Sequence, residues 1–276
     1  MDQRHATNPE QLPGMTTAEL RRHYLVETVF TPDAIHLTYS HHDRIVLGGA
    51  CPASGPLTLA AEPELRSASF FEHREAGLVN VGGPGRVALG DQLHDLPHGA
   101  CLYIGRGQPD PVLSSHAGGD PARFYIFSAP AHSAFPTALV LPGQGVTREL
   151  GDPLTSNERS LNQYICPQGV LSCQIVMGVT SLHPGNIWNT MPAHTHDRRT
   201  ECYLYFDLPA DARVVHLCGQ PDETRHLLVA DQQAVISPSW SVHAGVGTAA
   251  YSFVWAMAGE NQAFDDMDLV TAAELR

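Results

Sequence analysis

The stretch Gly185–Phe206, GNIWNTMPAHTHDRRTECYLYF, holds the residues around which the rest of the chain is organised. His194 and His196 are separated by one residue, and side chains at positions i and i+2 of a strand point to the same face. The polar run 197–200 predicts a tight connection, after which Glu201 begins a run of strand-forming residues. If the two strands are neighbours, the Glu201 carboxylate meets both imidazoles around one metal ion.

A fourth ligand is predicted at His243, in the segment ISPSWSVHAGVG (236–247), where an apolar strand ends and a second short strand begins. Three imidazoles and one carboxylate suit a divalent ion such as zinc, iron(II), manganese, cobalt or nickel. The chain has 16 histidines, so a His-x-His pair by itself could equally be a surface pair. Glu201 on the same predicted face and His243 in a matching strand-turn favour the ligand interpretation.

Composition narrows the class of protein. The 276 residues are 43% hydrophobic and 16% charged, and glycine and proline are both abundant, which favours many short strands joined by turns. The formal net charge of −13 argues against a nucleic-acid or anionic-membrane partner. An anionic small-molecule substrate stays open, because a few local arginines override a distant field that is screened within about 10 Å.

The cysteines and the N-terminus indicate the compartment. None of the six cysteines forms a Cys-x-x-Cys pair, and most lie in apolar, strand-like runs. The N-terminus has no apolar signal core, and no stretch approaches the roughly 18–20 apolar residues of a membrane span. The sequence therefore predicts a protein of the reducing cytoplasm.

The strand pattern predicts an all-β protein made of two jelly-roll-like β-barrel halves with a few short helices. The halves are expected over 1–150 and 151–276, and only the second contains the ligand set. The first half is interpreted as a structural barrel and a candidate oligomer surface.

Local signals predict some details of this arrangement. Residues 1–14 are expected to be a flexible or draped terminus, and a threonine of the pair Thr16-Thr17 is expected to cap a short helix with an acidic first turn. The pair Gly90-Asp91 between alternating runs predicts a hairpin. A short helix is predicted over Val270–Leu275.

A small β-barrel with His-x-His, a following glutamate and a distant histidine resembles the cupin superfamily. Over nearly its whole length the chain is also similar to a narrower family, the 5-keto-4-deoxyuronate isomerases (4-deoxy-L-threo-5-hexosulose-uronate ketol-isomerases) of pectin breakdown. The similarity is carried by Tyr39-Ser-His41 with Asp43-Arg44, Leu154–Asn157, Asn189–Pro192 with His194-Thr-His196, Val235–Ser241, His243 with Gly245–Gly247, and Gly259–Gln262 with Phe264–Asp268.

This resemblance implies a specific chemistry. It implies one zinc ion per subunit, held by His194, His196, Glu201 and His243, in a barrel of cupin type that assembles as a homo-hexamer. It also implies an aldose–ketose isomerisation, through an enediolate, that forms 3-deoxy-D-glycero-2,5-hexodiulosonate from a small uronate substrate. Zinc as a Lewis acid would stabilise the enediolate charge without any redox change.

The reaction also needs a general base near the metal. Glu201 could serve if it loosens from the metal. Tyr203 and Tyr205 share its predicted face, because strand side chains alternate, and they could relay protons or bind hydroxyl groups. Packing of the two tyrosines inside the barrel is the alternative.

The substrate carboxylate calls for a bidentate arginine. Arg198 and Arg199 are the predicted substrate-binding residues because they lie beside the ligands, and alternation predicts that at most one of them faces inward. Arg159 and Arg225 are less well supported candidates for this role. Trp240 is predicted to wall the pocket, with core packing as the alternative.

Two other functions remain open from the sequence. The same four ligands would serve an iron-dependent cupin dioxygenase, which oxygen consumption would reveal. A non-catalytic cupin that binds sugars or regulates is the other alternative, and the full ligand set argues against it.

Overall fold

The computed structural model describes all residues 1–276. It has one α-helix, α1 (Thr17–Tyr24), and three 3-10 helices: η1 (Pro9–Gly14), η2 (Pro63–Leu65) and η3 (Pro153–Thr155). The chain divides into two compact units, a first unit of residues 1–4, 28–146 and 163–177 and a second unit of residues 5–27, 147–162 and 178–276. The two units are therefore interleaved along the chain, and the domain limits 1–150 and 151–276 stay a prediction.

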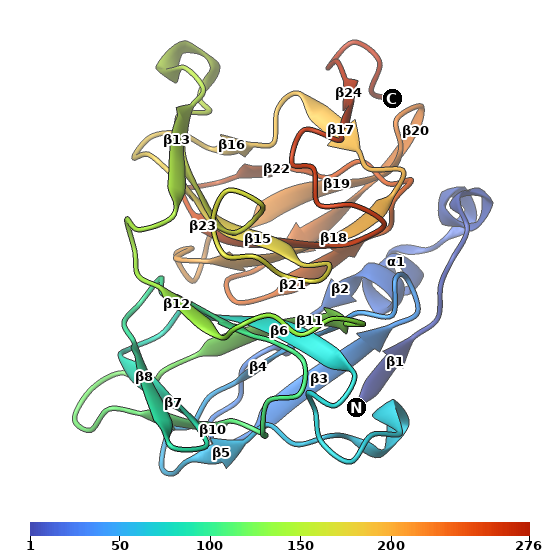
Figure 1. Ribbon diagram of the computed structural model, residues 1–276. Coiled ribbons are helices and arrows are strands. Elements are labelled where there is room, and N and C mark those ends of the chain that lie inside the picture. Colours follow the sequence, from blue (N-terminus) through green and yellow to red (C-terminus); the bar gives the residue numbers. More distant parts are fainter. The chain divides into compact units, whose positions relative to one another are not determined.

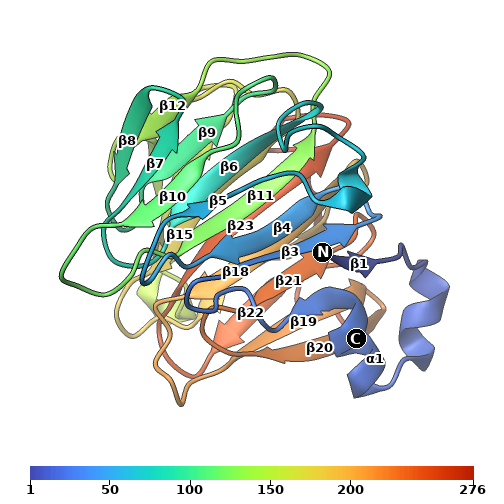
Figure 2. The same cartoon turned by 90° about the horizontal axis from the view of Figure 1, so that it is seen from below.

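The first unit is built on two sheets, whose strands run side by side in Figures 1 and 2. The larger one is, in spatial order, β1 (Asp2–Arg4), β3 (Ile35–Ser40), β4 (Val46–Ala50), β11 (Phe124–Pro130), β6 (Arg74–Asn80), β9 (Cys101–Ile104) and β12 (Ala138–Val140). The smaller one is β5 (Leu57–Thr58), β10 (Val112–Ser115), β7 (Gly85–Leu89) and β8 (Gln92–Leu96). Apart from the parallel pair β1–β3, these strands pair antiparallel.

A second seven-stranded sheet is, in spatial order, β13 (Val146–Leu150), β14 (Arg159–Ile165), β15 (Val176–Leu182), β23 (Ser252–Gly259), β18 (Arg199–Phe206), β21 (Ala234–Ser237) and β2 (Leu25–Val26). A four-stranded sheet of the second unit is β16 (Trp188–Asn189), β22 (Ala244–Gly247), β19 (Val214–Gln220) and β20 (Glu223–Val229). A small two-stranded sheet joins β17 (Ala193–Thr195) to β24 (Asp268–Val270). These five sheets, with only a few short helices, agree with the predicted all-β class.

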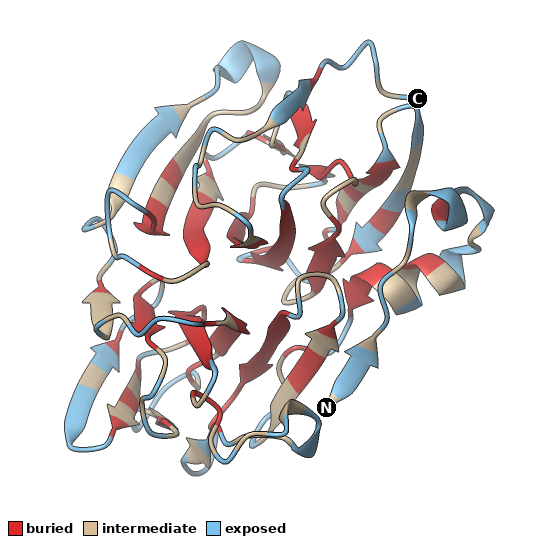
Figure 3. Ribbon diagram, turned by 45° about the vertical axis from the view of Figure 1, so that its right-hand side comes forward, coloured by how far each residue is buried: buried red, intermediate tan, exposed pale blue.

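The core lies on the central strands, which Figure 3 shows in the colour of buried residues, while many turns are exposed. Strand β18 is buried along all eight residues, because β21 and β23 flank it and both of its faces are covered. Its sequence is correspondingly apolar and aromatic on both faces, with Glu201 as the one acidic residue. The carboxylate of Glu201 is thus held in the interior of the second unit.

The predicted helix cap is confirmed. Thr16 accepts a hydrogen bond from the backbone N–H of Glu19, and the Glu19 carboxylate accepts from the backbone N–H of Thr16, which is a capping box at the start of α1. The hairpin at Gly90 is confirmed as well, since β7 and β8 flank it and Gly90 has a φ of 58°. A positive φ at that position favours glycine.

Of the two alternatives predicted for residues 1–14, the flexible terminus was wrong and the draped one agrees with the structure, because the segment forms β1 and η1 and Leu12 in η1 is 1% exposed. The short helix predicted over Val270–Leu275 was also wrong. Residues 270–275 do not form a helix. Val270 ends β24, where it pairs with Ala193, and Glu274 turns back to accept hydrogen bonds from Thr271. Strand pairing with a distant segment outweighs the local helical preference of so short a stretch.

A buried carboxylate anchors the first unit. Glu75 in β6 is fully buried and accepts hydrogen bonds from the Tyr103 hydroxyl at 2.6 Å and from the backbone N–H groups of Cys173 (2.6 Å), Gln174 (2.6 Å) and Ile175 (3.0 Å). Four donors on two oxygens compensate the charge without an ion pair. Glu75 therefore ties the chain at 173–175 to the middle of the larger sheet.

We expect Glu75→Gln to lower the free energy of unfolding by about 2–4 kcal/mol, because one amide N–H₂ then faces backbone donors that lose their acceptor. Denaturant titration followed by circular dichroism measures the change. Asp91→Asn, which removes an exposed charge from a hairpin turn, is the matched control. Equal stabilities of the two variants would contradict the anchoring role.

Candidate metal centre

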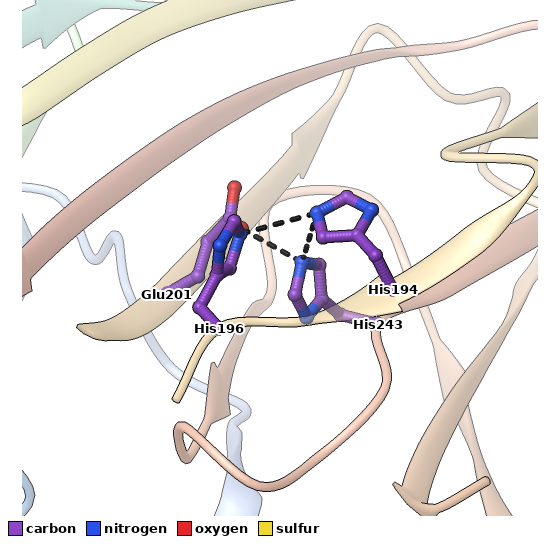
Figure 4. Close-up of side chains that lie close together, drawn as sticks. All are labelled: His194, His196, Glu201 and His243. Atoms are coloured by element: carbon purple, nitrogen blue, oxygen red, sulfur yellow. Dashed lines mark hydrogen bonds and ion pairs between the residues drawn. The ribbon is translucent and has the colours of Figure 1, made fainter. Parts of the chain in front are cut away.

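Three histidines and one glutamate converge inside the second unit (Figure 4). The Nε2 atoms of His194 and His196 are 3.1 Å apart, and the Nε2 atoms of His194 and His243 are 3.0 Å apart. Glu201 Oε2 lies 2.9 Å from His196 Nε2 and 2.8 Å from His243 Nε2. All four side chains are buried, and one potential ligand atom from each lies within 4.8 Å of the others.

The local backbone explains how these side chains meet. His194 lies in β17, His196 follows the end of that strand, and His243 directly precedes β22. The sequence predicted that the histidine strand and the glutamate strand could be neighbours. They are not hydrogen-bonded to each other, because β17 pairs with β24, and β18 pairs with β21 and β23. Glu201 therefore reaches the histidines between sheets rather than along one sheet.

Hydrogen bonds on the outer ring nitrogens orient two of the imidazoles. His196 Nδ1 lies 2.8 Å from the Asp266 carbonyl oxygen, and His243 Nδ1 lies 3.3 Å from the Ser241 carbonyl oxygen. A carbonyl oxygen only accepts, so both contacts call for a proton on Nδ1. At His196 the Arg199 Nη2 donor also lies 3.2 Å from Nδ1, and the shorter contact to the Asp266 carbonyl oxygen favours the Nδ1–H tautomer. Each Nε2 then presents its lone pair to the centre, as in metal-binding histidines whose second nitrogen is hydrogen-bonded.

Burial and charge set the protonation states. Burial lowers the pKa of His194 to about 2, with a further contribution from His243. Burial alone would raise the pKa of Glu201, but the neighbouring His243 and His196 hold it well below its ordinary value. His194 is therefore a neutral imidazole and Glu201 an ionised carboxylate.

This donor set fits a divalent metal ion. A metal with bonds of about 2.0–2.1 Å places neighbouring ligand atoms about 3.0–3.4 Å apart. The four measured separations of 2.8–3.1 Å are close to that range. Three nitrogen ligands with one oxygen ligand are typical of zinc and related borderline ions.

A cavity of about 190 Å³ opens beside the cluster. His194, His196 and Glu201 lie in its wall, together with Leu150, Arg159, Leu161, Thr180, Thr190, Met191, Pro192, Tyr203, Phe253, Trp255, Met257, Phe264, Met267 and Leu269. The wall is mostly apolar away from the cluster. A small organic molecule could therefore place polar oxygens on the cluster and its carbon chain against the apolar wall.

The two predicted catalytic tyrosines have different environments. Tyr203 lines the cavity, and its hydroxyl lies 2.9 Å from Thr190 Oγ1. Burial, together with the charge of Glu201, holds the pKa of Tyr203 well above its ordinary value, so the hydroxyl stays protonated. Tyr205 does not line the cavity, and its hydroxyl lies 2.8 Å from Nδ1 of the buried His216.

The predicted substrate-binding residues do not line the cavity. Arg198 is exposed and lies 3.5 Å from the Glu260 carboxylate. Arg199 is buried beneath the cluster, where Nη2 donates to the Asp266 carbonyl oxygen at 2.9 Å. Trp240 packs edge-on against Tyr24, with ring centroids 6.4 Å apart. Period-two alternation correctly predicted that only one of the two arginines points inward. It could not predict that Arg199, the inward one, lies outside the cavity wall.

The structure places other residues at the cavity that the ligand motif did not indicate. Arg159 and Leu161 line it from β14, and Phe264 and Met267 line it from the segment that leads into β24. The period-two alternation of Arg159 and Leu161 was the available signal for a shared face. No sequence signal connects β14 to the histidine motif, which lies more than thirty residues further along the chain.

Comparisons with known proteins agree with this geometry. The model of the KduI/IolB family matches residues 24–271. A 4-deoxy-L-threo-5-hexosulose-uronate ketol-isomerase of Kineococcus radiotolerans is 67% identical over 279 residues, covering 100% of both chains. A protein of the same name from Burkholderia cenocepacia is 50% identical over 278 residues, again covering 100% of both.

Solved structures with low sequence identity share the fold. An IolB-like protein of Salmonella typhimurium has a TM-score of 0.72 and 16% identity, with 91% of this chain and 98% of that chain covered. A variant of Bacillus subtilis oxalate decarboxylase has a TM-score of 0.53 and 12% identity, with 79% of this chain and 70% of that chain covered.

Together, the strand-rich units and the buried cluster define a protein of cupin-type fold with a candidate metal centre. The chain belongs to the KduI/IolB family. The predicted resemblance and the predicted fold class are thereby confirmed, as is the prediction of an enzyme of the ketol-isomerase class. No helix is long and apolar enough to cross a membrane, and all six cysteines are free.

The buried His216 behind the site generates a prediction for pH dependence. Burial lowers the pKa of His216 to about 3, so the unfolded chain binds this proton first as the pH falls below about 6.5. Stability is therefore lost on acidification between those two pKa values. At pH 5 the loss from this one residue amounts to about 2 kcal/mol.

We expect His216→Asn, which keeps an acceptor near the Tyr205 hydroxyl, to reduce this loss. The measurement is the free energy of unfolding of both proteins at pH 7 and pH 5. The decrease between the two pH values should be smaller in the variant by about 2 kcal/mol. Equal decreases would show that His216 is not a buried neutral imidazole.

Proposed function

We propose that the protein is a metal-dependent ketol-isomerase that interconverts 4-deoxy-L-threo-5-hexosulose uronate and 3-deoxy-D-glycero-2,5-hexodiulosonate. One observation carries the proposal: a buried three-histidine, one-glutamate cluster borders a cavity in a chain that is 67% identical, over its full length, to a protein named for this reaction. Similarity alone suggests the substrate, and the cluster supplies a chemical reason for it.

The reaction is an internal transfer of hydrogen. A proton leaves C2, the C1 aldehyde becomes a hydroxymethyl group through an enediolate, and the C2 hydroxyl becomes a ketone. No electron leaves the molecule, so no external oxidant is required. A divalent ion held by His194, His196, Glu201 and His243 would supply Lewis-acid stabilisation of the negative charge that develops on the C1 and C2 oxygens.

The composition excludes one other route. Aldehydes and ketones can be activated by a lysine Schiff base. All 16 basic residues of this chain are arginine, so no lysine is present to form one. The side chains of this protein therefore support activation of the substrate carbonyl group by electrostatic stabilisation at the His/Glu cluster.

Glu201 is the residue proposed to move the proton. It is the only carboxylate in the cavity wall. Its Oε2 faces His196 and His243, whereas no hydrogen bond engages Oε1. With Oε2 on the metal side, Oε1 is available to accept the C2 proton and to return it to C1. Glu201 therefore does not need to leave the cluster in order to act as a base.

Tyr203 is proposed to donate a hydrogen bond to a substrate oxygen. Its hydroxyl lines the cavity and stays protonated, because its pKa is raised by burial and by Glu201. The contact with Thr190 Oγ1 at 2.9 Å orients it. Tyr205 is proposed to support this region by packing, since its hydroxyl pairs with His216 outside the cavity.

Zinc, one ion per subunit, is proposed as the metal because the reaction needs a Lewis acid without redox activity. A homo-hexamer acting in the cytoplasm, on uronates released during pectin breakdown, completes the proposal. Its support is the resemblance to the isomerase family, and the six free cysteines agree with a reducing compartment.

We expect purified protein to contain one equivalent of zinc and to isomerise the unsaturated uronate from pectin lyase digests without oxygen. His243→Ala should lose the metal and the activity together, because it removes one of four ligands. His226→Ala, which removes an exposed histidine from β20, is the control. Elemental analysis and a product assay under nitrogen give both readouts.

Three outcomes of this experiment would point elsewhere. Iron content with oxygen consumption would make the protein a cupin dioxygenase. Binding of sugar without turnover would make it a sugar-binding cupin. Isomerisation that survives complete metal removal would reduce the metal to a structural role.

Glu201→Gln tests the proton transfer separately from metal binding. The amide keeps an oxygen ligand but is a much weaker base, so kcat should fall by about 10²–10⁴-fold at saturating zinc. Transfer of deuterium from D₂O to the carbon that was C1 of the substrate should fall in parallel. Glu223→Gln, an exposed residue of β20, is the control. A zinc-loaded Glu201→Gln variant with normal turnover would exclude Oε1 as the base.

A further inference from the structure

The cavity wall contains a single cationic side chain. Among the residues that line the cavity, Arg159 is the only arginine, and the chain has no lysine. The same wall contains His194, His196 and Glu201, so Arg159 and these candidate metal ligands border one cavity. A ligand in that cavity could therefore contact both the His/Glu cluster and the Arg159 guanidinium.

The other arginines of this region lie outside the cavity wall, although Nε and Nη1 of the buried Arg199 have no hydrogen-bond partner. Arg198 is on the surface beside Glu260, and Arg199 is buried under the cluster with its Nη2 on the Asp266 carbonyl oxygen. Arg148 lies over the Phe264 ring, 5.4 Å from its centroid. None of the three lines the cavity.

Arg159 has unused hydrogen-bonding capacity. Its one hydrogen bond runs from Nη1 to the Asn157 carbonyl oxygen at 2.8 Å, and no carboxylate pairs with it. Burial lowers its pKa, and the nearby Tyr203 and Tyr251 phenols act in the opposite direction. A partly desolvated cation without a counter-charge is unfavourable, and an anionic ligand would remove that penalty.

The shape of the guanidinium selects the kind of anion. Arginine presents parallel N–H donors that match the two oxygens of a carboxylate. Leu161, Phe253 and Trp255 make the wall apolar, which suits a methylene group better than a hydroxyl group. An acyclic 4-deoxyuronate has these features: a carboxylate at C6, a methylene at C4, and the reacting oxygens at C1 and C2.

We propose that Arg159 binds the C6 carboxylate of the substrate while C1 and C2 face the metal cluster, and that this contact selects uronates over neutral sugars. The assignment rests on the proposed function, which supplies the substrate. It moves carboxylate recognition from Arg198 and Arg199, beside the histidine motif in the sequence, to a different strand, β14.

The test compares zinc-loaded wild type with Arg159→Met, Arg159→Lys and two controls. Arg159→Met should lower kcat/KM for the uronate by about 100-fold or more, because the carboxylate loses a bidentate, charge-assisted partner. Arg159→Lys keeps the positive charge but not the two parallel N–H donors, and it should lower kcat/KM by about tenfold. Zinc content should stay at one equivalent in both, since Arg159 is not a ligand.

The controls distinguish the arginines. Arg22→Met removes an exposed guanidinium from α1 and should leave kcat/KM unchanged. Arg198→Met tests the position favoured by the sequence. Wild-type kinetics in both Arg159 variants, or a large loss in Arg198→Met alone, would overturn the assignment while leaving the proposed function intact. Should Arg159→Met fail to fold, Arg159→Lys carries the comparison.

Calorimetric titration separates failure of this inference from failure of the proposed function. The probes are D-galacturonate and D-galactose, which differ at C6. The wild type should bind galacturonate more tightly than galactose, and Arg159→Met should lose that preference. If the wild type shows no turnover but Arg159-dependent binding of galacturonate, only the proposed reaction is wrong. If the wild type does not discriminate between the two sugars, the carboxylate site itself is refuted.

Discussion

The contact of the Glu201 carboxylate with two imidazoles, at 2.8 and 2.9 Å, is the interaction on which the candidate site depends. A carboxylate buried in the centre of a sheet would be strongly unfavourable without compensation. A cation held by Glu201, His196 and His243 would provide it, and carbonyl groups near the outer nitrogens of the two rings orient them. Burial keeps the imidazole of His194 neutral. The buried carboxylate and the neutral His194 ring therefore form part of a ligand set for a cation.

The C-terminal segment completes this centre. The Asp266 carbonyl oxygen meets both His196 Nδ1 and Arg199 Nη2, and β24 pairs with the histidine strand β17. Phe264 and Met267 from the same segment form part of the cavity wall. Local unfolding of this segment would expose the candidate metal ligands and remove the carbonyl oxygen that orients His196. The segment thus links the shape of the cavity to the orientation of the His196 ring.

The division of labour within the cavity follows from its uneven polarity. The cluster and Tyr203 concentrate the groups that can stabilise charge and handle a proton, whereas Arg159 supplies a separate positive charge. An apolar wall also limits competition from water for both sets of groups. A substrate with reactive oxygens at one end and a carboxylate at the other is complementary to this arrangement. A neutral sugar would leave Arg159 without a partner.

The sequence by itself determined the donor residues, since the His194-x-His196 spacing, Glu201 in the next strand and His243 in a later strand-turn are local patterns. It also determined the strand-rich class, through alternation and turn residues such as Gly90. Only the tertiary structure decided that β17 pairs with β24, that Arg199 lies under the cluster, that Trp240 packs on Tyr24 and that Arg159 reaches the cavity. Period-two alternation specifies the face on which a side chain stands, whereas long-range strand pairing specifies what that face meets.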